Sequence, residues 1–139
     1  MTSELLAYCA TPSRLAHLTD EIIDYVLYRV ERLPLHPFPI LPRRLYEDGP
    51  IGRERTMKVC LRLVDHCDAL LLFGVSEGTM REVTRAIYRG KPIALIDGFD
   101  PERETFYEKL KAKFNNPLDK FEWVSRDDPE KVKRLLSTA

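Results

Sequence analysis

The sequence lacks the features of a disulfide-bonded or metal-bound fold. Its 139 residues include three cysteines, Cys9, Cys60 and Cys67, and no Cys-x-x-Cys pair. An odd number of cysteines without paired spacing argues against a disulfide framework and against a structural zinc site. We therefore expect free thiols, a cytoplasmic protein, and neither a metal nor a cofactor.

An excess of charge of one sign is also lacking. Lysine plus arginine and aspartate plus glutamate number 22 each, so the formal net charge is zero. The chain thus lacks the positive field of a nucleic-acid binder and the basic skew of a membrane-surface protein. No apolar run has the length of a membrane span, and the N-terminus does not resemble a signal peptide. These absences predict a small-molecule ligand, with no nucleic acid and no membrane as partners.

Short apolar runs alternate with helical patterns along residues 1–139, which fit a single domain. The runs predict strands, and the patterns predict helices. Expected strands cover residues 5–10, 68–73, 93–96 and 121–125, and expected helices cover residues 15–32, 53–66, 80–89, 100–114 and the chain from 129 onward. This alternation predicts an α/β, Rossmann-like three-layer sandwich with a parallel sheet of about five strands.

Prolines gather in one segment, residues 33–50, which holds five of the ten in the chain. Proline cannot donate to a strand ladder, so any strand in this segment should be short and lie at the edge of the sheet. We expect most of the segment to be an extended surface loop.

The most informative segment is residues 70–86, Leu-Leu-Leu-Phe-Gly-Val-Ser-Glu-Gly-Thr-Met-Arg-Glu-Val-Thr-Arg-Ala. An apolar run of strand length leads into a turn with two glycines and then into a helical pattern. In a parallel sheet such a turn lies at the carboxyl edge of the strands, where ligands bind. Gly74 and Gly78 allow a tight turn and the close approach of a ligand.

Polar side chains at this predicted edge are suited to an anionic ligand. Ser76, Thr79 and the first-turn amides of the helix supply hydrogen-bond donors, and Arg14 follows the first strand. Glu82 lies one turn into the helix, where its carboxylate can face the same cleft. Asp97 closes the strand over residues 93–96, so it is a secondary candidate for the same edge.

The turn also matches the Gly-x-Ser-x-Gly nucleophile elbow of serine hydrolases, with Ser76 as the nucleophile. In that fold the catalytic histidine follows the serine in the chain. His17, His36 and His66 all precede Ser76. We therefore do not expect a serine hydrolase.

Two blocks of sequence resemble the nucleoside 2-deoxyribosyltransferase family. Residues 8–14, Tyr-Cys-Ala-Thr-Pro-Ser-Arg, resemble its first strand and loop, and residues 67–82 resemble the strand, turn and helix that carry its catalytic glutamate. Ala86 and the Gly-Lys-Pro at residues 90–92 continue the likeness. The resemblance implies a Rossmann-like fold, a homodimer or larger homo-oligomer, and cleavage of the N-glycosidic bond of a nucleoside or its 5′-monophosphate.

The resemblance also implies roles for individual residues. Glu82 would be the nucleophile, with Tyr8 beside it, and Ser13 and Arg14 would lie near the sugar or the phosphate. Ser76 matches the serine that the monophosphate N-glycosidase branch has where the transferases carry aspartate. We therefore favour hydrolysis of a nucleoside 5′-monophosphate over base exchange.

The chain departs from the family at its second acid. Protonation of the departing base calls for an acidic group, and the family places an aspartate on the helix before residue 68. This chain has Lys58, Cys60 and Arg62 near that position. The nearest carboxylates, Asp65 and Asp68, fall at the end of a helix and the start of a strand.

Two other functions therefore stay open. A non-catalytic nucleotide-binding or sensing module on the same fold would explain the missing acid. A phosphoribohydrolase of the cytokinin-releasing type is also similar, because residues 76–82 approximate its Gly-Gly-x-Gly-Thr-x-x-Glu loop without the preceding Pro-Gly-Gly.

Overall fold

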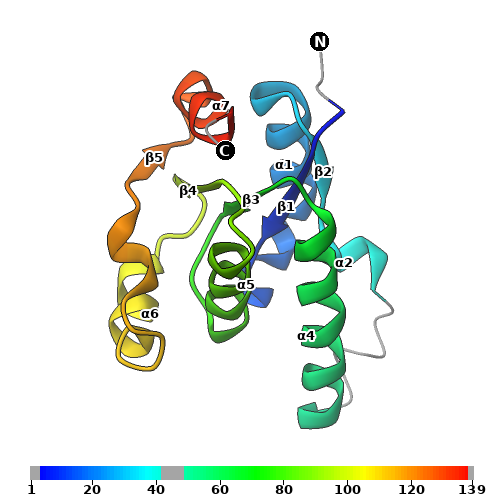
Figure 1. Ribbon diagram of the computed structural model, residues 1–139, viewed down its shortest axis with the longest axis vertical. Helices are drawn as coiled ribbons and strands as arrows, with labels where there is room; N and C mark the ends of the chain where they lie inside the picture. The colour runs from blue at the N-terminus through cyan, green and yellow to red at the C-terminus, as the bar shows by residue number, and fades with distance from the viewer. Residues whose placement is uncertain (1–3, 42–48, 138–139) are drawn as a thin grey trace.

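A single parallel sheet of five strands organises the computed structural model, which describes residues 4–41 and 49–137 (Figure 1). The strand order is β2-β1-β3-β4-β5, and every neighbouring pair is parallel. The strands are β1 (Leu6–Ala10), β2 (Leu33–Leu35), β3 (Ala69–Leu72), β4 (Ile93–Asp97) and β5 (Trp123–Ser125). The predicted parallel α/β sheet is therefore confirmed.

Helices cover both faces of the sheet and complete a Rossmann-like three-layer sandwich (Figure 1). One face carries η1 (Ser13–Leu18), α1 (Thr19–Asp24), η2 (Tyr25–Val30) and α7 (Pro129–Ser137). The other carries α4 (Gly49–His66), α5 (Glu77–Tyr88), α6 (Arg103–Leu110) and η3 (Pro117–Lys120), and α2 (Pro37–Ile40) follows β2. Within the described ranges, no helix combines the length and the apolar character that crossing a membrane requires.

The two cores follow from the alternation of side chains along each strand. Ala7 and Cys9 of β1 pack toward α1, η2 and α7, whereas Tyr8 and Ala10 pack toward α4 and α5. β3 is buried on both faces, as is usual for a parallel strand between two helical layers. Its apolar run in the sequence reflects this double burial.

The strand order creates a crevice at the carboxyl edge of the sheet. From β1 the chain runs outward to β2 on one side, and β3, β4 and β5 follow on the other. The connections leaving β1 and β3 therefore diverge, and ligands of doubly wound sheets bind at such a point.

Three predicted helices differ from those observed. The segment predicted over residues 15–32 divides into a 3-10 turn, an α-turn and a π-turn, and this arrangement keeps Tyr25, Val26 and Val30 all buried. The helix predicted from residue 53 begins at Gly49. The helix predicted over residues 100–114 is shorter than expected and covers Arg103–Leu110.

The proline-rich segment contains more regular structure than we expected. It begins with β2, a three-residue edge strand, as predicted, and continues into the short helix α2. Pro34 is tolerated in β2 because the strand has a neighbour on one side only. Residues 42–48 of this segment lie outside the described residues.

Candidate functional site

A cleft of about 810 Å³ lies beside the carboxyl ends of β1 and β3. Its walls come from the loop after β1, from α2, from one side of α4 and from the first turns of α5. This volume is typical of small-molecule sites. The predicted turn between residues 74 and 78 therefore does lead into a cleft at the carboxyl edge of the sheet.

Glu82 lies in this cleft with its side chain almost fully buried, at 4% exposure. Tyr8, which is fully buried on β1, donates its hydroxyl hydrogen to Glu82 Oε2. The Cys60 thiol on α4 lies near the Glu82 carboxyl and acts on its pKa. The structure thus brings together the two predicted catalytic residues, Glu82 and Tyr8, from strands and helices far apart in the sequence.

Burial controls the protonation of this cluster. It raises the pKa of Glu82 from 4.5 to about 8, against the lowering effects of the hydrogen bond from Tyr8 and of the Cys60 thiol. Burial and then the nearby Glu82 charge raise the pKa of Tyr8 well above its ordinary value and that of Cys60 to about 12. No lysine or arginine in the described part of the chain forms an ion pair with Glu82.

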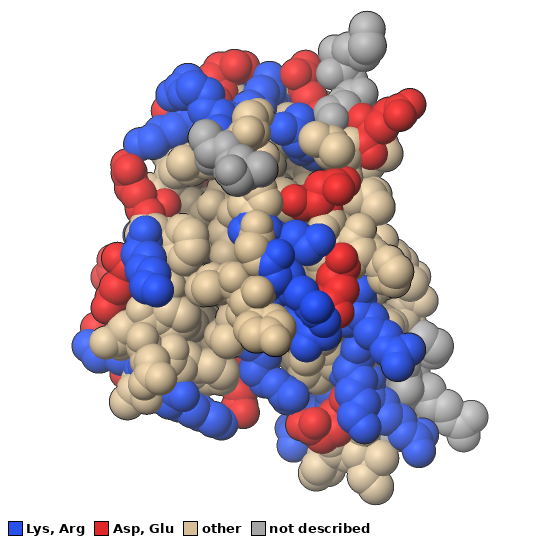
Figure 2. Space-filling view, in the orientation of Figure 1, with Lys and Arg blue, Asp and Glu red and all other residues tan. Residues whose placement is uncertain are grey.

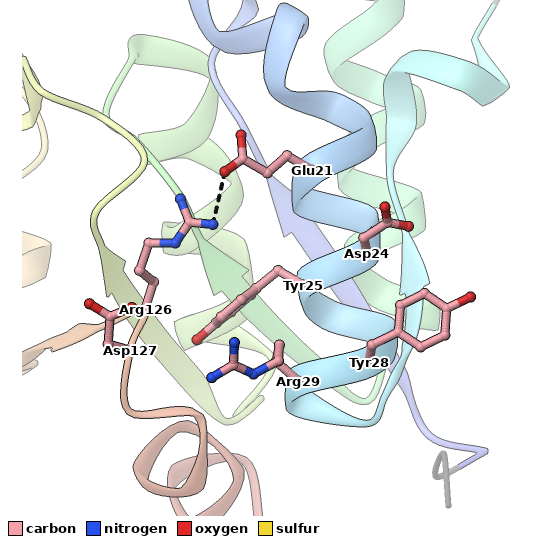
Figure 3. A pocket seen from close by; sticks show the side chains of 7 residues that line it. All are labelled: Glu21, Asp24, Tyr25, Tyr28, Arg29, Arg126 and Asp127. Atoms are coloured by element: carbon pink, nitrogen blue, oxygen red, sulfur yellow. Dashed lines mark ion pairs between the residues drawn. The ribbon is translucent and has the colours of Figure 1, made fainter.

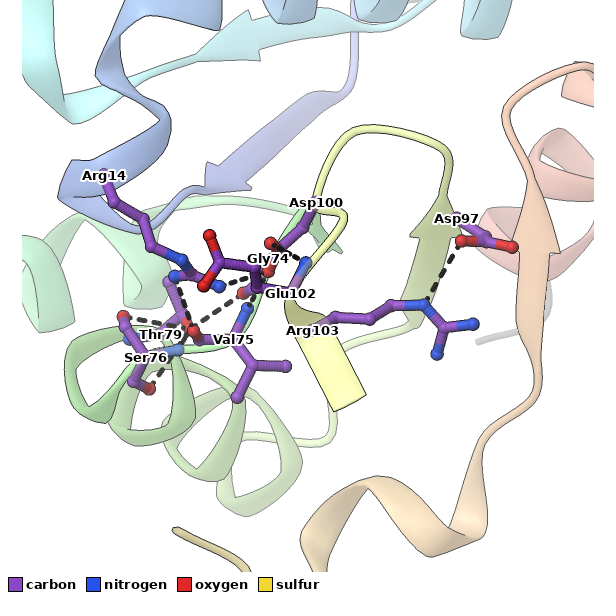
Figure 4. Close-up of polar contacts among 9 residues, drawn as sticks. All are labelled: Arg14, Gly74, Val75, Ser76, Thr79, Asp97, Asp100, Glu102 and Arg103. Carbon is purple, nitrogen blue, oxygen red and sulfur yellow. Dashed lines mark hydrogen bonds and ion pairs between the residues drawn. The ribbon is translucent and has the colours of Figure 1, made fainter. Parts of the chain in front are cut away.

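Ser76 and Thr79 begin α5 as a reciprocal cap (Figure 4). The Thr79 N–H donates to Ser76 Oγ (3.1 Å), and the Ser76 N–H donates to Thr79 Oγ1 (2.8 Å). Thr79 Oγ1 also donates to the Gly74 carbonyl at 2.9 Å. Both residues line the cleft, but their hydroxyls already hold the start of the helix.

The two glycines of the turn have different surroundings. A Cβ atom on Gly74 would lie 2.7 Å from Asp100 Oδ2 and 2.9 Å from atoms of Leu15 and Pro12. Gly74 therefore permits close internal packing, and the predicted ligand approach is not what its surroundings require. Gly78 lines the cleft, where a Cβ atom would lie 3.1 Å from Met57 Cε.

Arg14 makes contacts within the protein and does not line the cleft. Its Nη1 donates to the Val75 carbonyl at 2.8 Å, and its Nη2 pairs with Asp100 (Figure 4). Its guanidinium also lies 3.8 Å from the centroid of the Phe106 ring. Asp100 also accepts from the Val75 N–H at 3.1 Å. Ser13, the neighbouring predicted phosphate ligand, does line the cleft.

Asp97 is held at the other side of the sheet edge. Its carboxylate pairs with Arg103 at 3.2 Å, and the Arg103 guanidinium lies 4.3 Å above the Trp123 ring. Figure 4 shows this pair apart from the Ser76–Thr79 turn. Among the described residues that line the cleft, Asp97 does not occur.

No second buried carboxyl group accompanies Glu82 among the described residues of the cleft. Asp65 binds Arg85 at 2.6 and 2.7 Å and ties α4 to α5, and Asp68 accepts the Leu6 N–H at 2.8 Å. The cleft does contain Glu54 and Glu77, but both are exposed and form ion pairs with basic residues. The acid missing from the sequence is therefore not supplied from elsewhere in the described fold.

Sequence reasoning missed one wall of the cleft. Arg53, Thr56, Met57 and Cys60 line it from α4. Their spacing, i, i+3, i+4 and i+7, is that of one helical face, so the pattern could have identified them. Phe38 also lines the cleft, and no local signal in the proline-rich segment marks it.

Two of these α4 residues, Thr56 and Arg53, have polar groups that could bind a ligand. Thr56 Oγ1 is buried without a hydrogen-bond partner. Arg53 forms no ion pair with the described residues. Arg53 lines the cleft, whereas Arg14, the predicted phosphate ligand, does not.

The described residues contain no group of three or more histidine, cysteine, aspartate or glutamate side chains placed to hold a metal ion. In comparisons with known proteins, neither a family model nor a curated sequence matches this chain. The likeness to nucleoside 2-deoxyribosyltransferases stays a prediction.

Proposed function

We propose that this protein hydrolyses the N-glycosidic bond of a nucleoside 5′-monophosphate, with Glu82 as the nucleophile. The observation that carries the proposal is the burial of Glu82 in a cleft of ligand size, with a hydroxyl and a thiol as its partners. Strongly perturbed carboxyl groups in clefts are characteristic of catalytic sites.

The charge balance of the site favours a cationic transition state. Ionised Glu82 has no cation among the described residues to neutralise it, and its side chain is almost fully buried. N-glycosidic cleavage develops positive charge on the sugar, which a carboxylate stabilises or captures. The substrate therefore supplies, in its transition state, the positive charge that the site lacks.

The proposed reaction has two steps. In the first, the Glu82 carboxylate bonds to the sugar carbon as the C–N bond breaks, and the base leaves with the electron pair and takes a proton from water. In the second, a water molecule bonds to the same sugar carbon as the bond to Glu82 breaks, and the carboxylate is released. The proton lost by this water neutralises the hydroxide left by the first step. Tyr8, bonded to Oε2, orients the carboxyl group throughout.

The entrance of the cleft suits a phosphate. Arg53 and the first turn of α5 line it, and helix N-termini favour anions. Lysine and arginine side chains also gather over the part of the surface that α4 and α5 form, despite the zero net charge (Figure 2). These features support a monophosphate over a free nucleoside.

A second candidate is a nucleotide sensor without catalysis. It is favoured by the lack of a second buried carboxyl group among the described residues of the cleft, because departure of the base is then unassisted by a protein acid. The same cleft and the same ligand class serve both proposals. They differ in whether the bond breaks.

Product analysis separates the two candidates. The protein is incubated with ribo- and deoxyribonucleoside monophosphates, including N6-substituted adenosine monophosphates, and free base is measured by chromatography. The matching nucleosides without phosphate serve as controls. We expect base release from a monophosphate and little from its nucleoside. Thermal stabilisation of the protein by a monophosphate without release of base would favour the sensor. If no compound is hydrolysed and none stabilises the protein, both proposals are refuted.

A further inference from the structure

A second pocket lies on the opposite face of the sheet from the Glu82 cleft. Its volume is about 340 Å³, at the lower end of the range for small-molecule sites. The wall that carries Tyr25 and Arg29 belongs to α1 and η2, and the facing wall, with Arg126 and Asp127, follows β5 (Figure 3).

The Tyr25 hydroxyl is the unexplained group in this pocket. Tyr25 is 5% exposed, and its hydroxyl is buried without a hydrogen-bond partner. Its ring packs edge-on against Phe73 and Phe99, with centroids 6.3 and 5.4 Å away, so the orientation of the ring is fixed. Buried hydroxyls are normally satisfied, so an unpaired one that lines a pocket indicates a missing ligand or water.

The Arg29 guanidinium points toward that hydroxyl, whereas the Arg126 guanidinium points toward Glu21 (Figure 3). Arg126 is held in place, because its guanidinium lies 3.9 Å above the Phe99 ring and pairs with Glu21 at 2.8 Å. Arg29 forms no ion pair with the described residues. Arg29 and Arg126 both line the pocket. Burial raises the pKa of Tyr25 to about 12, and the positive charges of Arg126 and Arg29 act against that rise.

The acidic side chains that line the pocket favour some classes of ligand over others. Asp127 lines the same pocket, and its negative charge adds to the rise in the pKa of Tyr25. Glu21 is already paired with Arg126, and Asp24 lines the pocket from the end of α1. The Asp127 carboxylate would repel a doubly charged anion such as phosphate. A singly charged carboxylate group can instead pair with the planar guanidinium of Arg29.

We propose that this pocket binds a small zwitterion of the size of a free amino acid. The carboxylate of the ligand accepts hydrogen bonds from the Tyr25 hydroxyl and the Arg29 guanidinium, and its ammonium group contacts Asp127. This inference is independent of the reaction proposed for the Glu82 cleft, because the two pockets use different residues on different faces of the sheet.

The experiment is an NMR titration of the labelled full chain with glycine and with L-alanine. Acetate, methylammonium and inorganic phosphate are the comparison probes. We expect the amide signals of Arg29, Arg126 and Asp127 to shift with either amino acid, more weakly with acetate, and not with phosphate. No shift with either amino acid, or tighter binding of phosphate, would overturn the proposal.

Matched variants identify the groups that bind. Tyr25→Phe removes only an unpaired hydroxyl, so the fold should be retained while affinity for the amino acid falls by about tenfold. Arg29→Met should have an effect of the same size, and Tyr88→Phe, on α5 and with its side chain 79% exposed, should have none. Unchanged affinity in Tyr25→Phe and Arg29→Met would also overturn the proposal. Glu82→Gln should leave amino-acid binding unchanged.

Discussion

Glu82 and Asp100 are almost equally buried at the carboxyl edge of the same sheet, at 4% and 5% exposure, but their partners differ. Asp100 pairs with Arg14 and accepts backbone N–H groups from the turn after β3 and from the start of α6. The neighbours of the Glu82 carboxyl are the Tyr8 hydroxyl, which donates a hydrogen bond to it, and the Cys60 thiol. A buried charge is tolerated where a cation and N–H groups satisfy it. The Asp100 charge is therefore satisfied within the fold, whereas ionised Glu82 requires a positive charge from outside.

The largest expected effect is on turnover. Glu82→Gln should lower the rate of base release by about 1,000-fold or more, because the amide keeps the shape of the side chain but loses the nucleophile. The measurement is release of free base from the best monophosphate substrate. Glu77→Gln is the matched control, since Glu77 lines the same cleft on α5 but is exposed and paired with Lys113. Equal rates in the two variants would remove Glu82 from the reaction.

The corresponding change at Asp100 should affect stability. Asp100→Asn leaves the half-buried Arg14 without its carboxylate, and we expect a loss of about 3 kcal/mol in the free energy of unfolding. Asp97→Asn breaks the more exposed pair with Arg103 and should cost less than about 1 kcal/mol. Urea denaturation measures both. Similar losses in the two variants would mean that burial of the Arg14–Asp100 pair has no special importance.

Glu82 should make the protein less stable as the pH rises. Its pKa of about 8 in the folded protein lies above the ordinary 4.5, so its favourable contribution is complete below about pH 4.5 and is lost as the pH rises through 8. Glu82→Gln should therefore be more stable than the wild type at pH 8, by on the order of 2 kcal/mol. Urea denaturation at several pH values tests this, and a difference that does not grow with pH would contradict it.

Much of the fold could be predicted because its signals are local. The buried strands β1, β3 and β4 were marked by apolar runs, and the start of α7 by Asp128, whose Oδ1 accepts the Lys131 N–H at 3.2 Å. The same Asp-Pro pattern at Asp100 failed as a helix start. There Oδ1 of Asp100 accepts the Glu102 N–H, but Oδ2 pairs with Arg14, 86 positions away, and local spacing cannot reveal that partner.

The candidate site could be predicted only in part, for the same reason. Glu82 and Ser76 follow a glycine-containing turn, and that turn has a local signature. The burial of Glu82 depends on elements such as β1, which carries Tyr8, and α4, which carries Cys60, and only the assembled fold brings these together. The contacts of Arg14 with Val75 and Asp100 likewise form only in the assembled fold. Its position after the first strand therefore indicated a phosphate ligand, although its guanidinium already has partners within the protein.

The pH dependence of kcat/KM for base release tests the central claim most directly, because that claim requires ionised Glu82 to face the substrate. For the wild type we predict a rate that rises with pH and levels off above about pH 8. In Tyr8→Phe the midpoint should move to higher pH, because the hydrogen bond from Tyr8 lowers the pKa of Glu82. A wild-type rate that is flat or falls between about pH 6 and pH 8 would contradict the account, since it would mean that the reaction does not need the Glu82 carboxylate.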